Sequence, residues 1–226
     1  MVPKRITLFA GHYGSGKTNL ALNYAAWIRR TTRARVILLD LDIVNPYFRS
    51  NDSATELASQ GIELVVSDYA NTNVDLPALP KETYAALADR EAYLVFDVGG
   101  DDRGALALGR YVDEIRREGD YEMLAVVNFS RPLTETSEAA LEILREIETV
   151  CALPFTALVN NTNLGNETTI ETLRASAIKA DELATKTGLP IRMTSVREDL
   201  ADAASSVFDC IFPLTIQKLY YQIEKE

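Results

Sequence analysis

The sequence predicts an α/β fold: a doubly wound, mainly parallel β-sheet of about seven to eight strands with helices on both faces. Short β-rich runs alternate with helical runs from one end of the chain to the other. Several of the β-rich runs are continuously apolar, as strands covered on both faces are. No internal repeat, low-complexity tract or interdomain linker interrupts the alternation, so residues 1–226 are expected to form one domain.

The elements follow in order along the chain. Strands are predicted at residues 5–10, 35–40, 62–67, 93–98, 123–129, 155–160, 191–196 and 210–214, and helices near 17–30, 53–60, 81–89, 104–118, 134–149, 167–187, 199–206 and 216–225. Thr134, Ser137 and Glu138 mark a helix start, and Gly188-Leu189-Pro190 is a helix stop. Residues 68–81 carry Asn and Pro with little periodicity, which predicts a long loop that either carries specificity or is a plain solvated connection.

Composition narrows the class of protein. Of the 226 residues, 47% are hydrophobic and 25% are charged, which is ordinary for a globular domain. No apolar run approaches the ~18 residues needed to cross a bilayer. Met1 to Arg5 runs straight into the first strand without a secretory signal, and Cys151 and Cys210 make neither a disulfide framework nor a metal pair, so a cytoplasmic location is expected.

The net charge of −10 argues against two kinds of partner. Nucleic-acid binding depends on Lys and Arg that neutralise phosphates, and an anionic membrane surface also attracts basic segments. We therefore expect no nucleic-acid and no membrane partner. A single nucleotide can still bind, because local donors set the field at such a site.

A phosphate-binding pattern, G-x-x-x-x-G-K-[ST], lies between the first predicted strand and the first predicted helix. Glycines let such a loop turn tightly so that backbone N–H groups face phosphate oxygens, and the helix that follows adds the positive end of its dipole. Lys17 would reach the β- and γ-phosphates, and the Thr18 hydroxyl would ligate Mg²⁺. The residues expected to bind nucleotide here are Gly11, His12, Tyr13, Gly14, Ser15, Gly16, Lys17, Thr18 and Asn19.

Two strand ends supply the carboxylates that such a loop needs. Asp40 and Asp42 end the second predicted strand, at the edge where ligands sit in parallel sheets. The fourth strand places four apolar residues before Asp97, which is the Walker-B arrangement. Asp97 to Gly100 also fits D-x-x-G, in which the glycine amide reaches a γ-phosphate.

This order of motifs resembles the partition and cell-division ATPases of the ParA/MinD type. They belong to the deviant Walker-A (SIMIBI) class and to the CobQ/CobB/MinD/ParA nucleotide-binding domain family. The resemblance implies that Asp42 activates the hydrolytic water, so that Lys17 and Asp42 are the expected catalytic residues. It implies that Asp40 supports the water shell of Mg²⁺ and that Asp97 holds the ion through water, which with Thr18 completes the expected metal site.

The resemblance also implies ATP as the ligand. In the family an Asn at the end of the sixth strand often pairs with adenine, and Asn160 matches that place, with Asn161 next to it. An Asn amide offers a base both a donor and an acceptor. Residues 160–163 lack the Lys and Asp of a guanine-reading N-K-x-D loop, which favours ATP over GTP.

His12 is a departure from the family pattern. The signature lysine of the family follows the first loop glycine and reaches the phosphates of a partner subunit, and here His12 stands in its place. Imidazole is shorter than a lysine side chain and only partly charged at neutral pH. His12 is either a weakened substitute in a possible homodimer or a loop residue that faces solvent or protein.

Three functions remain open. The favoured one is Mg²⁺-dependent ATP hydrolysis coupled to the switching of a protein partner. The second is a small-molecule phosphotransferase or ligase of the dethiobiotin-synthetase-like type. In that case the substrate would be bound by the 68–81 loop, Tyr47, Arg49 and Arg131; Arg131 would otherwise only start a helix. The third is a nucleotide-gated binding module with negligible turnover. The terminal helix pattern at residues 216–225 has no basic face and is expected to pack on the sheet.

Overall fold

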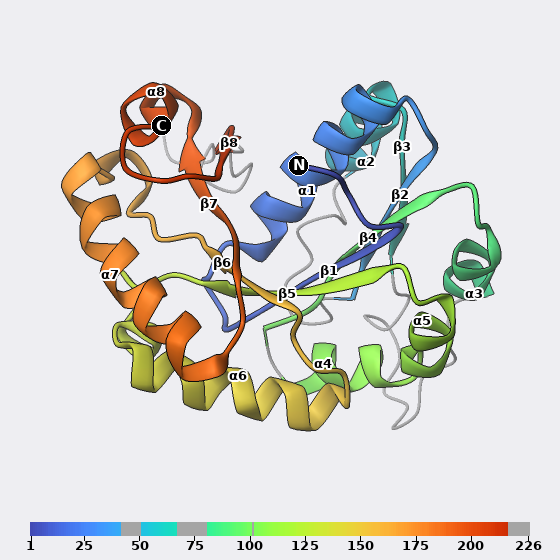
Figure 1. Cartoon of the computed structure of the whole chain (residues 1–226). Coiled ribbons are helices and arrows are strands. Elements are labelled where there is room, and N and C mark those ends of the chain that lie inside the picture. Colours follow the sequence, from blue (N-terminus) through green and yellow to red (C-terminus); the bar gives the residue numbers. More distant parts are fainter. Residues whose placement is uncertain (42–50, 67–80, 101, 217–226) are drawn as a thin grey trace.

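The computed structural model describes residues 1–41, 51–66, 81–100 and 102–216 (Figure 1). Its centre is an eight-stranded sheet in the order β3-β2-β4-β1-β5-β6-β7-β8, in which all neighbouring strands are parallel. The strands are β1 (Ile6–Ala10), β2 (Val36–Asp40), β3 (Ile62–Val66), β4 (Tyr93–Asp97), β5 (Tyr121–Val127), β6 (Ala157–Asn160), β7 (Ile191–Arg197) and β8 (Ile211–Leu214).

Helices connect the strands. They are α1 (Lys17–Thr32), α2 (Asn51–Ser59), α3 (Lys81–Ala88), α4 (Asp102–Gly109), α5 (Val112–Glu118), α6 (Ser137–Cys151), α7 (Ile170–Thr187) and α8 (Ala201–Ala204). Short 3₁₀ turns at η3 (Pro132–Thr134), η4 (Gly165–Glu167) and η5 (Glu198–Leu200) precede α6, α7 and α8. The predicted α/β fold and its parallel sheet are confirmed.

The prediction of a single helix at residues 104–118 is wrong. Residues 104–118 form two helices, because α4 ends at Gly109 and α5 begins at Val112. Between them Tyr111 N–H donates to the Leu108 carbonyl at 2.9 Å, a tight turn in place of the helical pattern. The turn buries Tyr111 against the ring of Tyr84, with 5.1 Å between ring centroids. Gly109, a poor helix former, is the last residue of α4, and the Tyr111 ring packs beside the turn that follows it.

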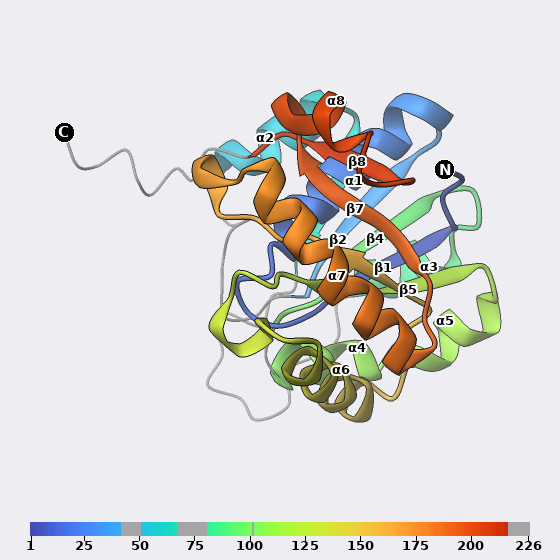
Figure 2. The same cartoon turned by 60° about the vertical axis from the view of Figure 1, so that its left-hand side comes forward.

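The core has two layers, one on each face of the sheet. On one face α1 and α2 cover β1 and β2 with residues such as Leu20, Ile28 and Leu57. On the other face α3 to α7 contribute residues such as Leu108 and Leu144. Figures 1 and 2 show α1 and α2 on one side of the sheet and α4 and α6 on the other. The sheet is therefore covered on both faces, which explains its continuously apolar strands.

The strand order places β1 at the centre of the sheet, between β4 and β5. The chain adds β2, β3 and β4 on one side of β1 and then β5 to β8 on the other. The order therefore reverses at β1, and ligands of open parallel sheets bind beyond the carboxyl ends of the strands at such a point. The segment that follows β1 is the phosphate motif.

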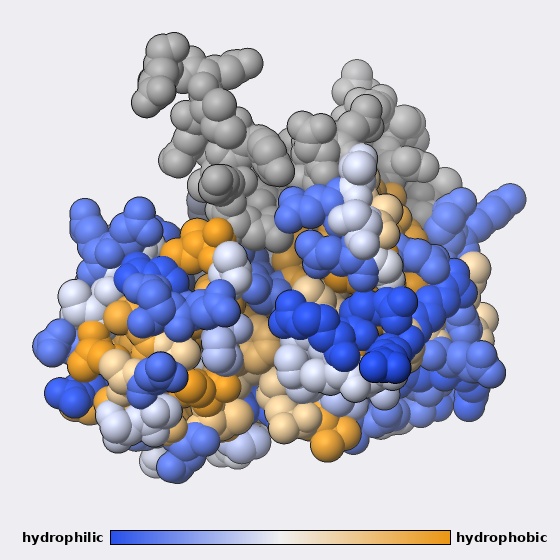
Figure 3. Space-filling model, turned by 90° about the horizontal axis from the view of Figure 1, so that it is seen from above, coloured by the Kyte–Doolittle hydropathy of each residue, from blue (hydrophilic) through white to orange (hydrophobic). Residues whose placement is uncertain are grey.

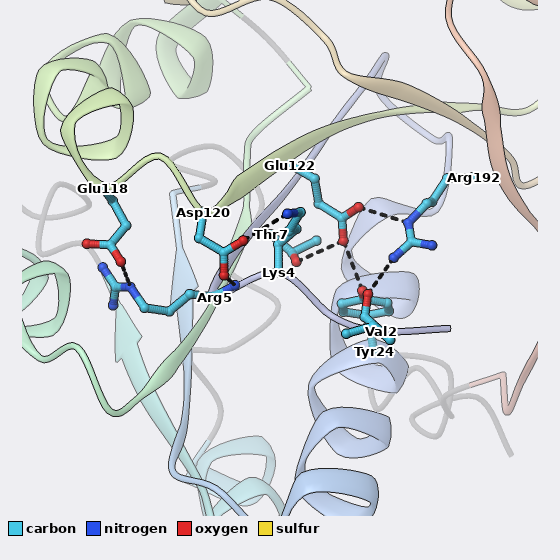
Figure 4. A network of polar contacts seen from close by, with 9 residues as sticks. All are labelled: Val2, Lys4, Arg5, Thr7, Tyr24, Glu118, Asp120, Glu122 and Arg192. Atoms are coloured by element: carbon cyan, nitrogen blue, oxygen red, sulfur yellow. Dashed lines mark hydrogen bonds and ion pairs between the residues drawn. The ribbon is translucent and has the colours of Figure 1, made fainter.

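The edge of the sheet formed by the amino ends of the strands holds a network of polar side chains, among them the buried Tyr24 and Glu122 (Figure 4). Glu122, at the start of β5, accepts hydrogen bonds from Tyr24 of α1 at 3.0 Å and from Arg192 of β7 at 2.9 Å. Arg192 also donates to the Val2 carbonyl at 2.7 Å. Burial, and then the charge of Glu122, raise the pKa of the Tyr24 hydroxyl above its usual value. The network joins α1 to β5 and β7 at the edge away from the phosphate motif.

The surface on one side of the molecule is mainly hydrophilic (Figure 3). Figure 3 shows the side that lies uppermost in Figure 1, and hydrophilic residues cover most of it while apolar residues form small groups. Within the residues described above, none of the helices combines the length and the apolar character that a membrane span requires. The predicted terminal helix at residues 216–225 lies outside the described residues except for Ile216.

Candidate functional site

The phosphate motif forms the turn between β1 and α1. Gly14 and Gly16 both have positive φ angles, 76° and 86°. Left-handed residues at alternating positions turn successive N–H groups toward one side, and such a concavity binds anions. Gly16 is also the N-cap of α1, so the helix dipole points its positive end into the turn. Gly11 is required for another reason, because a Cβ there would lie 2.2 Å from the Val126 carbonyl oxygen of β5.

The carbonyl groups of this loop are held by side chains and by the loop itself. The His12 carbonyl accepts from Ser15 N–H at 3.1 Å and from Lys17 Nζ at 3.2 Å. The Gly14 carbonyl accepts from Arg131 Nε at 3.1 Å, and the Ser15 carbonyl accepts from Asn161 Nδ2 at 2.5 Å. Carbonyl oxygens repel anions. Because these carbonyls accept hydrogen bonds from the protein, their oxygens are kept out of the concavity.

His12 and Tyr13 form the tip of the loop. His12 Nδ1 lies 2.9 Å from the Tyr13 carbonyl oxygen, which can only accept, so Nδ1 carries the proton in this contact. The Tyr13 side chain is 66% exposed. His12 therefore has a partner within its own loop, and its role toward a second subunit stays a prediction.

The interior of the loop contains two buried polar side chains. Lys17 is only 6% exposed, so its ammonium group lies under the loop rather than in solvent. The Ser15 hydroxyl is also buried, and it has no hydrogen-bond partner among the described residues. A buried hydroxyl without a partner is costly unless a ligand or water completes it. Both side chains suit a loop that closes around an anion.

The three predicted metal-site residues lie on neighbouring elements, Thr18 on α1, Asp40 on β2 and Asp97 on β4. Asp40 and Asp97 are direct partners in the parallel register of β2 and β4, and both are buried. The Thr18 hydroxyl donates to Asp97 Oδ2 at 2.6 Å. A hydroxyl and two carboxylates are hard oxygen ligands, which Mg²⁺ prefers. The donor set therefore fits a nucleotide-bound Mg²⁺.

Gly100 brings the segment after β4 against the loop. A Cβ on Gly100 would lie 2.7 Å from Tyr13 N and 2.8 Å from Lys17 Nζ. A Cβ on Gly104 would likewise lie 2.5 Å from Gly99 Cα. Glycine is needed where two backbones approach this closely. The D-x-x-G segment therefore lies beside the Lys17 ammonium group, where the γ-phosphate is expected.

Asn160 is the last residue of β6 and Asn161 follows it, and the two side chains have different partners. Asn160 donates to Ser176 Oγ of α7 at 2.8 Å and accepts from the Thr162 hydroxyl at 2.7 Å. Asn161 binds the Ser15 carbonyl and accepts a hydrogen bond from the Ser195 hydroxyl of β7. The Oδ1 of Asn160 also accepts from the Thr162 backbone N–H at 3.2 Å, so pairing of Asn160 with a base would require these side-chain bonds to open, and this role stays a prediction.

Several expected residues lie outside the described part of the chain. They are Asp42, Tyr47, Arg49 and all of the predicted 68–81 loop except Lys81. Asn19 is described and lies in the first turn of α1, where its carbonyl accepts from Asn23 Nδ2 at 2.8 Å. The structure also shows residues that sequence reasoning missed. Asn128, fully buried after β5, donates to the Asn163 carbonyl at 3.2 Å and so joins the loops after β5 and β6. Its place directly after an apolar strand was the available signal.

The fold has clear neighbours among solved structures, although no family model and no curated protein matches the chain. Cell division protein ftsY from Thermotoga maritima superposes with a TM-score of 0.61 at 16% identity, covering 86% of this chain and 62% of that one. Signal recognition particle receptor FtsY from Elizabethkingia anophelis gives 0.54 at 16% identity, covering 87% and 60%. FlhF complexed with GMPPNP/Mg²⁺ gives 0.52 at 12% identity, covering 84% and 65%.

These likenesses define the class of fold. The chain has the parallel α/β fold of the P-loop NTPases, and it spans about three fifths of the length of the neighbours it resembles. At identities this low the likeness shows the fold alone. The chemistry of this chain has to come from its own residues.

Proposed function

We propose that this chain is a P-loop ATPase of the ParA/MinD type, which binds ATP with Mg²⁺ and couples hydrolysis of the γ-phosphate to the switching of a protein partner. One observation carries the proposal. Thr18, Asp97 and Asp40 lie on neighbouring elements, and the glycine loop before Thr18 has carbonyls that are held by the protein and a lysine that is buried. This is the arrangement that cradles a polyphosphate and its metal ion.

Each residue then has a defined task. The loop amides and Lys17 stabilise the charge that spreads over the γ-phosphate oxygens in the transition state. Thr18 would bind the metal ion directly, and Asp97 and Asp40 would hold the water molecules around it. When bound, Mg²⁺ neutralises charge on the β- and γ-phosphates. Asp42, which follows β2 by two residues, is proposed to orient the attacking water, and the Gly100 amide to contact the γ-phosphate.

ATP is the proposed nucleotide because of the loop after β6. Residues 160–163 read Asn-Asn-Thr-Asn and lack the acidic residue that would pair with guanine. The FlhF neighbours were crystallised with GTP/Mg²⁺ or GMPPNP/Mg²⁺, which supports a nucleoside triphosphate with Mg²⁺ but favours the other base. A comparison of both nucleotides is therefore part of the test.

The test combines binding with turnover. Calorimetry with Mg²⁺ and non-hydrolysable analogues of ATP and GTP should show binding of the ATP analogue, and Mg·ATP should yield phosphate slowly without any added metabolite. Lys17→Ala should abolish both. Lys179→Ala is the matched control, since Lys179 is a partly exposed lysine of α7 that donates to the Glu135 carbonyl, and its replacement should leave both intact.

Other outcomes would assign other functions. ADP release that depends on an added small molecule would indicate a phosphotransferase or ligase. Tight binding without ADP production would indicate a nucleotide-gated binding module. If neither nucleotide binds the wild-type chain with Mg²⁺, the proposal is wrong.

A further inference from the structure

Two side chains from outside the phosphate motif hold consecutive carbonyl groups of the phosphate loop. Arg131 precedes η3, in the segment after β5, and its Nε donates to the Gly14 carbonyl at 3.1 Å. Asn161 follows β6, and its Nδ2 donates to the Ser15 carbonyl at 2.5 Å. We call these two residues the carbonyl clamp. The motif itself demands neither of them.

The clamped peptide groups are the ones that can rotate. Gly14 and Gly16 have left-handed φ angles and flank Ser15, and glycine populates both signs of φ with little cost. If the Ser15–Gly16 peptide turned over, the Ser15 carbonyl would replace the Gly16 N–H inside the concavity. An anion site would then present an oxygen instead of a donor.

Each clamp residue is itself fixed. The Asn161 side chain is 3% exposed, and its Oδ1 accepts from Ser195 of β7, so its Nδ2 can only face the loop. A Cβ on Gly16 would lie 2.4 Å from that Nδ2, which shows how closely the two segments pack. Arg131 N–H donates to the Asn128 carbonyl at 3.1 Å, which anchors the arginine backbone to the end of β5.

We propose that Arg131 and Asn161 are positioning residues for phosphate binding: they hold the Gly14 and Ser15 carbonyls outward and so keep the loop amides directed at the anion. The proposal rests on the proposed function, because it concerns the same loop. This role of Arg131 differs from the two considered from the sequence, a contact with a second substrate and the start of a helix.

Arg131 offers the cleaner test because its side chain is exposed, so its replacement should leave the fold intact. The probes are Mg·ATP and inorganic Mg·tripolyphosphate, which shares only the phosphate chain. Arg131→Met should weaken binding of both by a similar factor, about three- to tenfold for one hydrogen bond. Arg131→Lys can still donate to the Gly14 carbonyl and should restore most of the affinity.

Two controls separate positioning from charge. Arg30→Met removes the same charge from an exposed site near the far end of α1 and should leave both affinities unchanged. The loss in Arg131→Met should persist at about 1 M salt, where the Debye length is only about 3 Å. Asn161→Leu keeps a side chain of similar size, has no donor for the Ser15 carbonyl and adds no charge, and it should weaken both ligands at least as much as Arg131→Met.

Three results would overturn the inference while leaving the proposed function standing. The first is that Arg131→Met binds both ligands with wild-type affinity. The second is a loss of affinity confined to Mg·ATP, which would indicate a contact with the base or sugar. The third is a loss of affinity that disappears at high salt. If the wild-type chain binds neither ligand, the proposed function fails and this inference fails with it.

Discussion

The replacement Gly11→Ala tests whether the phosphate loop depends on close contact with the sheet. Gly11 does not have a positive φ angle, so alanine is compatible with its backbone. The obstacle is the Val126 carbonyl oxygen of β5, which would lie 2.2 Å from the new Cβ, whereas ordinary contacts begin at 3.4 Å. Val126 is paired with Val159 of β6, so β5 cannot move without disturbing its other neighbour.

The magnitude follows from that geometry. Relief of the contact needs a displacement of about 1.2 Å between the end of β1 and a central strand. Overpacking of a well-packed core costs typically 1–3 kcal/mol, and a backbone atom yields less than a side chain, so we expect a loss of about 3 kcal/mol in the free energy of unfolding. The same displacement moves the first residue of the phosphate loop and should abolish nucleotide binding.

Gly119→Ala is the matched control. Gly119 has a φ angle of 77° and nothing lies within 4 Å of a Cβ placed there, so strain alone acts, at about 1 kcal/mol. Urea unfolding gives both free energies, and calorimetry with Mg·ATP gives the affinities. If Gly11→Ala is no less stable than Gly119→Ala and binds nucleotide normally, the argument from close packing is refuted.

Two further predictions concern single hydroxyl groups. Thr18→Val removes the donor to Asp97 and should eliminate the Mg²⁺-dependent part of ATP affinity measured by calorimetry with and without Mg²⁺, while Thr31→Val on the same helix should not. Burial and Glu122 raise the pKa of Tyr24 above 10.0, so the folded chain keeps a proton that the unfolded chain releases. The contribution of Tyr24 to stability should therefore be fully present below about pH 10 and be lost as the pH rises above it. Tyr24→Phe should flatten this decline in urea unfolding, and an equal decline in both proteins would contradict the assignment.

Local sequence determined much of the fold. Uninterrupted apolar runs such as residues 36–39 and 94–96 can only be satisfied between two helical layers, which is why a doubly wound sheet could be predicted. The glycine pattern of residues 11–18 predicted the turn between β1 and α1, because few residues tolerate the backbone angles found at Gly14 and Gly16. Polar residues directly after apolar strands predicted which side chains line the ligand edge.

The tertiary structure decided which of those side chains meet. Asp40 and Asp97 are far apart in sequence and become partners only because β4 inserts between β2 and β1. Gly109 is a local signal for the end of α4, but the contact of the Tyr111 ring with Tyr84 of α3 exists only in the folded chain. The hydrogen bonds from Arg131 and Asn161 to the phosphate loop likewise depend on strand order, which is set by packing of the whole sheet. Sequence motifs define the chemistry that is possible at each strand end, and long-range pairing determines which of those groups act together.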